Sequence, residues 1–188
     1  MTYPTPADIA AAADRITGRV RRTPILEVEA GALGLSYPVT LKLEHTQVTG
    51  SFKVRGAFNN MLSREVPPAG VVAASGGNHG AAVAYAATEL GHASRIYVPK
   101  AIAKEEKLRR MRMFGGEVIL TEGSVADCMA QYTAAAESSG ALSVHPYDTE
   151  WTLAGQGTVA REFEEQAGGP GSIDTILVAT GGGGLIGG

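Results

Sequence analysis

The sequence has little of several features that define whole classes of protein. Its 188 residues include one cysteine, Cys128, which excludes an internal disulfide framework and favours a reducing compartment. We expect Cys128 to be core or surface filler. Lysine and arginine together number 16 against 19 acidic residues, a net charge of -3. Because a nucleic-acid-binding domain needs a basic excess, no nucleic-acid partner is predicted.

The chain also lacks long hydrophobic runs. No stretch approaches the roughly 18 apolar residues of a membrane span, and residues 1–13 lack the basic start and apolar centre of a secretory signal. We therefore expect a cytoplasmic protein with no membrane association, and we assign no metal ligand. The length suits one domain or two small ones.

From residue 71 the predicted elements alternate regularly between strands and helices. Such alternation argues for an α/β fold with a parallel sheet covered by helices. Strands are expected over 71–74, 95–98, 117–121, 142–144 and 173–179, and helices over 81–90, 104–114, 125–137 and 153–166. Before residue 71 we expect a helix over 6–19 opened by Thr5 or Thr2, an extended stretch over 23–26, a short helix over 27–33, and a strand over 39–43. The turn at Pro67 to Gly70 divides the chain, so residues 71–146 are predicted as a smaller unit, with 1–70 and 147–188 together in a larger one.

Lys53 lies just inside the start of a predicted helix, within the stretch Thr49 to Ala57. Thr49 or Ser51 could cap that helix, whose N-terminus carries partial positive charge. Both this charge and partial burial beside Phe52 should lower the lysine pKa. Lys53 is therefore a candidate nucleophile toward a carbonyl, and the alternative is a solvated lysine in a first turn.

The first glycine cluster runs from Ser75 to Gly80, between a buried strand and an alanine-rich helix. Backbone N–H groups at such a helix start favour an anion, so a carboxylate or phosphate fits there. The alternative is a tight strand-to-helix turn, although Asn78 and His79 add polar side chains that a turn does not require.

The second cluster runs from Gly181 to Gly188, directly after an apolar segment. Successive glycines suit a loop that wraps a phosphate with its N–H groups. Gly182, Gly184 and Gly187 also satisfy the weak dinucleotide pattern G-x-G-x-x-G, and a flexible linker is a further alternative.

Several motifs together resemble the serine/threonine dehydratase and serine racemase family, pyridoxal-phosphate enzymes of the tryptophan-synthase-β fold type. The resemblance extends over essentially the whole chain, in the same order. It rests on residues 41–57 (LKLEHTQVTGSFKVRGA), 75–79 (SGGNH), 145–148 (HPYD), 155–158 (GQGT) and the closing glycine run. It implies two open twisted, mainly parallel sheets flanked by helices. It also implies that the larger domain is incomplete in a chain of this length, so a fragment of a longer polypeptide is expected.

The resemblance implies a role for particular residues. Lys53 would hold the aldehyde of pyridoxal 5'-phosphate as a Schiff base, with Phe52 against the ring, and would then act as general base. Asn78 would hydrogen-bond the phenolic oxygen of the cofactor. The cofactor phosphate would be held by Gly181, Gly182, Gly183, Gly184 and Leu185. The substrate carboxylate would be taken by Ser75, Gly76, Gly77, Asn78 and His79. Gln156 is near the site in such folds, and we assign it no role.

The implied reaction is dehydration of a small β-hydroxy amino acid, giving 2-oxobutanoate from threonine or pyruvate from serine, with ammonia. In racemases of this family a second serine follows the position of Ser75, and here that position is Gly76. We therefore predict a dehydratase over a racemase. Dehydration of 3-hydroxyaspartate, a noncatalytic nucleotide-binding fragment and an inactive assembly partner remain alternatives. A homodimer is expected for this fold type.

Overall fold

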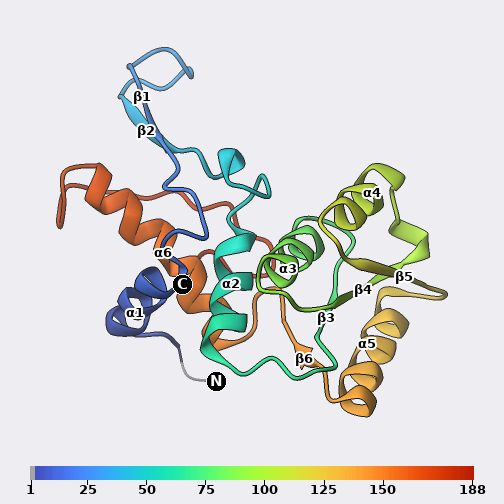
Figure 1. Ribbon diagram of the computed structural model, residues 1–188. Coiled ribbons are helices and arrows are strands. Elements are labelled where there is room, and N and C mark those ends of the chain that lie inside the picture. The colour runs from blue at the N-terminus through green and yellow to red at the C-terminus, as the bar shows by residue number, and fades with distance from the viewer. Residues whose placement is uncertain (1–2) are drawn as a thin grey trace.

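The computed structural model describes residues 3–188 (Figure 1). Helices and strands alternate through the middle of the chain, as the sequence predicts. The helices are α1 (Pro6–Ile16), α2 (Lys53–Ser63), α3 (Asn78–Glu89), α4 (Glu105–Met113), α5 (Val125–Ser139) and α6 (Glu150–Gln166). The strands are β1 (Ile25–Val28), β2 (Val39–Lys42), β3 (Val71–Ala74), β4 (Ser94–Pro99), β5 (Glu117–Thr121) and β6 (Leu142–Ser143). Two short 3-10 helices, η1 (Glu44–Thr46) and η2 (Lys100–Ile102), complete the described elements.

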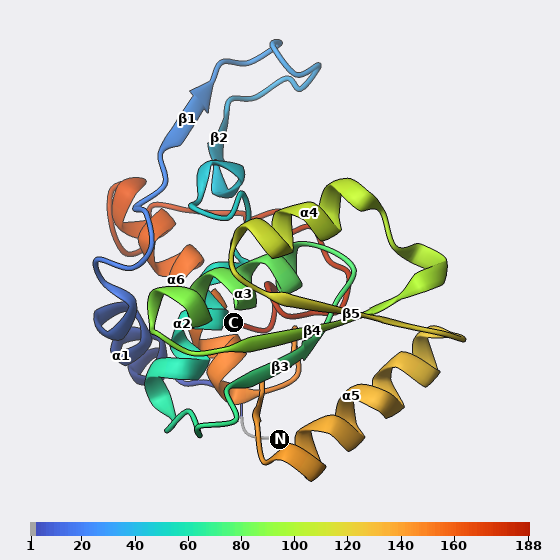
Figure 2. The ribbon, with the colours of Figure 1, turned by 45° about the vertical axis from the view of Figure 1, so that its right-hand side comes forward.

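The central sheet is four-stranded and parallel, in the order β5-β4-β3-β6. Helices α3 and α4 lie on one face of it and α5 on the other (Figure 2). Because β3 and β6 are parallel neighbours, their carboxyl ends meet at one edge of the sheet. The loop after β3 and the connection after β6 are thereby placed side by side, where open parallel sheets bind ligands.

Apolar side chains fill both sides of this sheet. Val71 and Ala73 of β3 pack toward the alanine-rich helix α3, and Val72 packs toward α5 with Tyr97 and Cys128. Cys128 is buried in this group, so of the two predicted placements, core or surface, the core placement is the one found.

A second group of helices, α1, α2 and α6, packs beside the sheet (Figure 1). Thr5 opens α1 with a capping box to Asp8, as the sequence predicts. The backbones of α2 and α6 cross at glycines, because a Cβ on Gly155 would lie 2.7 Å from the Cα of Gly56. The chain end returns to α6, where the carbonyl oxygen of Gly188 lies 2.6 Å from the Cβ position of Gly157. The close crossing of α2 and α6 holds in place the helix that begins with Lys53.

Two predicted elements are wrong. The short helix expected over 27–33 is replaced by β1 and a turn, because Ile25 to Val28 pairs antiparallel with β2 instead. The resulting hairpin projects from the rest of the molecule (Figures 1 and 2). The strand expected over Ile173 to Ala179 has no ladder partner among the described residues, and Leu177 is 86% exposed. A strand needs a neighbour for its N–H and C=O groups, so the apolar pattern alone does not produce one.

Within residues 3–188, no helix combines the length and the apolar character that crossing a bilayer requires.

Candidate active site

Lys53 is the first residue of α2, three residues after the turn at Gly50, where φ is +66°. Its Nζ donates a hydrogen bond to the carbonyl oxygen of Pro146 at 2.6 Å and lies 5.0 Å from the centre of the Phe52 ring. Burial lowers the pKa of the Lys53 amine, which confirms the predicted direction. A partly buried amine with a lowered pKa is a better nucleophile near neutral pH than a solvated one.

The predicted hydroxyl cap of α2 is wrong. Phe52 is the N-cap residue and is already in the helical region, at φ -57° and ψ -19°, so no side chain caps the helix. The hydroxyls of Thr49 and Ser51 are instead buried, and neither has a hydrogen-bond partner among the described residues. Two buried hydroxyls without a partner thus lie within the four residues before Lys53, and such groups usually have one.

A buried ion cluster anchors the first turn of α2, and nothing in the sequence pattern had indicated it. Arg55, only 1% exposed, donates to Glu44 at 2.7 and 2.9 Å and to Glu162 at 3.0 and 3.2 Å. Lys42 also donates to Glu162, at 2.5 Å. Burial opposes the charge on Arg55, but its hydrogen bonds to Glu44 and Glu162 outweigh burial and raise the guanidinium pKa. Through Arg55, two residues after Lys53, the cluster joins α2 to β2, η1 and α6.

The loop from Ser75 to Gly77 follows β3 and leads into α3. Ser75 Oγ accepts a hydrogen bond from the backbone N–H of Gly77 at 3.2 Å, and Asn78 begins the helix. The start of α3 thus lies near the carboxyl ends of the strands, and a helix start presents backbone N–H groups that have no partner within the helix.

His79, in the first turn of α3, is buried and electrically neutral. Its Nε2 lies 2.9 Å from the carbonyl oxygen of Val144, which can only accept, so Nε2 carries the proton. Burial lowers its pKa to about 3, the bond to Val144 opposes this shift, and the charges of Lys53 and His145 add to it. Nδ1 has no partner within the described part of the chain.

The second glycine cluster forms a compact turn in which the N–H of Gly187 donates to the carbonyl of Gly183 at 2.8 Å. Gly182 and Gly184 pack directly on Tyr147. Gly183 has φ +87°, a conformation that favours glycine. Leu185 is half-buried in the same turn.

The connection from β6 to α6 brings these parts together. Lys53 bonds to Pro146, His79 to Val144, and the glycine turn packs on Tyr147. The sequence identifies the three groups but not this meeting point, because a backbone carbonyl such as that of Pro146 leaves no signal in the sequence. Gln156 lies elsewhere, buried between α2 and α6, where its Oε1 accepts from Gly56 N–H at 3.3 Å.

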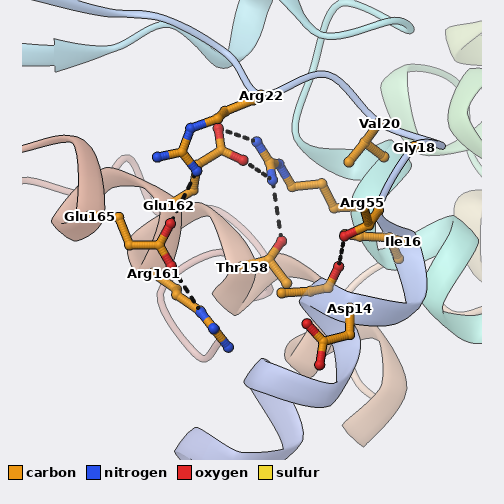
Figure 3. Close-up of a pocket in the computed structure, with 12 residues that line it drawn as sticks. Asp14, Ile16, Gly18, Val20, Arg22, Arg55, Thr158, Arg161, Glu162 and Glu165 are labelled. Carbon is orange, nitrogen blue, oxygen red and sulfur yellow. Dashed lines mark hydrogen bonds and ion pairs between the residues drawn. The ribbon is translucent and has the colours of Figure 1, made fainter.

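A cavity of about 340 Å³, whose lining does not include Lys53, lies between α1, α6, Arg55 of α2 and residues 18–22 (Figure 3). Its arginines are already paired: Arg55 with Glu162, and Arg22 and Arg161 with Glu165. These ion pairs engage all three arginines of the lining, so the cavity offers no unpaired arginine for an anionic ligand. Within residues 3–188 no group of three or more histidine, cysteine or acidic side chains could hold a metal ion.

Sequence and structure comparisons with known proteins agree on the family. The chain is 40% identical over 177 residues to L-threonine ammonia-lyase of Geobacter sulfurreducens, covering 93% of this chain and 43% of that protein. Its structure is similar to that of maize serine racemase, with a TM-score of 0.89 and 35% identity over 98% of this chain and 57% of that one. It is also similar to the threonine deaminase of T.th., with a TM-score of 0.88 and 37% identity over 97% of this chain and 58% of that one.

The chain thus spans about half the length of the relatives it matches. Residues 16–188 match the family described as pyridoxal-phosphate dependent enzyme. On this match, together with the fold and the placement of Lys53, the chain belongs to the family of pyridoxal-phosphate dependent enzymes.

Proposed function

We propose that the polypeptide is a pyridoxal-phosphate-dependent dehydratase of small β-hydroxy amino acids, converting L-threonine to 2-oxobutanoate and ammonia, or L-serine to pyruvate and ammonia. The observation that carries the proposal is the partly buried Lys53 amine, hydrogen-bonded to Pro146 and beside the Phe52 ring. Relatives named threonine ammonia-lyase and threonine deaminase support this substrate class.

The residues present fit the cofactor. Lys53 supplies an amine for its aldehyde, and Phe52 supplies an aromatic face 5.0 Å from that amine. The buried hydroxyl of Ser51, which has no partner among the described residues, lies two positions before Lys53. The glycine turn supplies backbone N–H groups for the phosphate, through Gly181 to Leu185. Asn78, exposed at the start of α3, would hydrogen-bond the phenolic oxygen.

When bound, pyridoxal phosphate supplies an electron sink for negative charge at the substrate α-carbon. The chain's own residues would do the rest. The Ser75 hydroxyl and the backbone amides of Gly76 to His79 would bind the substrate carboxylate at the start of α3, while the Ser75 amide stays bonded to the Tyr97 carbonyl. The Lys53 amine would remove the α-proton, and its lowered pKa increases the fraction that is neutral and able to act as a base.

A racemase is the second candidate, and the likeness to maize serine racemase favours it. Racemisation needs an acid or base on each face of the α-carbon, and Gly76 offers no side chain beside Ser75. We therefore favour dehydration, and 3-hydroxyaspartate stays an alternative substrate. Rapid formation of D-serine in a chiral assay would reverse this preference.

A dinucleotide site fits less well. The dinucleotide fingerprint requires a strand before the glycines and a helix after them. Residues 173–179 form no strand, and the residues after Gly184 form turns rather than a helix.

The direct test measures 2-oxo acid and ammonia released from threonine and serine by the purified protein. Lys53→Ala should abolish release, whereas Lys100→Ala, which removes an exposed lysine that pairs with Glu122, should leave it unchanged. Equal rates in the protein and Lys53→Ala would refute the assigned chemistry.

The division into a unit of residues 71–146 and a unit of 1–70 with 147–188 belongs to the same proposal. In support of it, the parallel sheet lies within the first unit, and α1, α2 and α6 pack on one another in the second. A homodimer and a cytoplasmic location remain predictions, which sedimentation and cell fractionation would test.

A further inference from the structure

The connection formed by residues 144–147 contains most of a motif, His145-Pro146-Tyr147-Asp148, whose members have no role in the proposal above apart from the Pro146 carbonyl. Tyr147 is the member that contacts the glycine turn. This contact is close enough to decide which residues the turn can contain.

Tyr147 occupies the space where side chains of the turn would otherwise lie. A Cβ on Gly182 would lie 2.5 Å from Cδ1 and 2.7 Å from Cε1 of the tyrosine ring. A Cβ on Gly184 would lie 2.7 Å from Cβ and 2.9 Å from Cα of Tyr147. Among the described residues, nothing lies within 4 Å of the corresponding positions at Gly181 and Gly183. Alternate residues of the turn thus rest on Tyr147 or face open space.

Tyr147 is itself held in place. Its ring meets the imidazole of His145 edge-on, with centres 4.7 Å apart and planes at 82°. His145 Nδ1 accepts the backbone N–H of Asp148 at 2.8 Å, which fixes the orientation of that imidazole. The carbonyl oxygen of His145 accepts a hydrogen bond from Thr152 of α6 at 2.8 Å. The support under the glycine turn is therefore anchored to a helix.

We propose that Tyr147 is a positioning residue that holds the backbone of Gly181 to Leu185 in the shape that binds the phosphate of the cofactor. The inference rests on the proposed function, because it takes that phosphate as the ligand. A run of glycines has many conformations, and its N–H groups bind an anion well only when they converge. The Tyr147 ring against Gly182, with its Cα and Cβ against Gly184, restricts these conformations and so lowers the entropy lost on binding.

Comparison of two ligands that differ only in the phosphate isolates this effect. Absorption titrations would give the dissociation constants of pyridoxal phosphate and pyridoxal for the protein, Tyr147→Phe, Tyr147→Ala and Tyr37→Ala. Tyr147→Ala should raise the dissociation constant of pyridoxal phosphate about tenfold or more, and that of pyridoxal less than about twofold. Tyr147→Phe keeps the ring and should behave as the unsubstituted protein. Tyr37→Ala removes a tyrosine that is 55% exposed in the hairpin and is the matched control.

If Tyr147→Ala raises both dissociation constants equally, the role of Tyr147 is merely structural and the inference is overturned. Unchanged binding of both would do the same.

A measurement without cofactor separates the inference from the proposed function. Gly182→Ala should lower the thermal unfolding midpoint of the protein, because its new methyl group meets the Tyr147 ring. In the Tyr147→Ala background the same change should cost much less, since the ring is gone. Strict additivity of the two substitutions would overturn the inference. If the two substitutions are coupled but the protein forms no lysine-linked cofactor, the contact between Tyr147 and Gly182 stands and the proposed function is refuted.

Discussion

The amine of Lys53 donates a hydrogen bond to the carbonyl oxygen of Pro146 at 2.6 Å, joining residues 93 positions apart in the chain. This bond links the start of α2 to the connection after β6, and that connection also contacts His79 and the glycine turn. The proposed cofactor-holding amine, carboxylate-binding loop and phosphate-binding turn thus share one short segment as their common support.

The environment of Lys53 predicts that it titrates at lower pH than an exposed lysine. Burial lowers the pKa of Lys53, whereas the hydrogen bond to Glu122 raises the pKa of Lys100. Competitive acetylation across a pH series, measured by peptide mass spectrometry, should therefore give a lower midpoint for Lys53 than for Lys100. The reverse order would show that Lys53 is solvated.

His79 predicts a loss of stability in acid. Its pKa is about 3 in the folded protein and 6.5 when unperturbed, so between these values the unfolded state binds more protons and stability falls as pH falls. His79→Gln can keep the donor to Val144 but does not titrate. Between pH 7 and 4.5 the protein should lose about 2 to 3 kcal/mol more unfolding free energy than the variant, as urea denaturation would show. If the unfolding free energies of the protein and the variant fall equally with pH, His79 is accessible to protons in the folded state.

The ion cluster predicts a strong contrast between two arginines. Arg55→Met would leave Glu44 and Glu162 without their main partner and should cost about 3 to 5 kcal/mol in unfolding free energy. Arg22→Met breaks only the exposed pair with Glu165 and should cost less than about 1 kcal/mol. Chemical denaturation measures both, and similar costs would show that the cluster is not an anchor.

The sequence predicted the parts of the fold that depend on local pattern and missed those that depend on distant partners. From residue 71 to 143 each strand is short and apolar and each helix is periodic, so type and order were predictable. Residues 25–28 became a strand because β2 pairs with them, and Ile173 to Ala179 did not because nothing among the described residues pairs there. A seven-residue helix over 27–33 could not compete with that pairing, since short helices are marginal.

The candidate site divides in the same way. Lys53 and the two glycine clusters carry their chemistry in residue type and spacing, so sequence identifies them. The carbonyl of Pro146 and the ring of Tyr147 act through long-range contacts and could not be assigned from sequence. Nor could Glu44 and Glu162 be identified from sequence as partners of Arg55, because burial rather than residue type distinguishes them from surface ions.

The crossing of α2 and α6 predicts intolerance of a single methyl group. Gly155→Ala would place Cβ 2.7 Å from the Cα of Gly56 and 2.8 Å from the carbonyl oxygen of Arg55, and backbone atoms cannot move aside easily. We expect a loss of about 1 to 3 kcal/mol in unfolding free energy. Ala160→Ser on the exposed face of α6 should change it by less than about 0.5 kcal/mol. If both variants match the unsubstituted protein, the helices do not cross this closely.

The central claim is that Lys53 holds pyridoxal phosphate. Its most direct test is the visible absorption spectrum of the purified protein with pyridoxal phosphate, before and after borohydride, followed by peptide mass mapping. The account predicts a yellow band that disappears on reduction and leaves the cofactor mass on Lys53. A colourless protein, or the mass on another lysine such as Lys42 or Lys100, would contradict it.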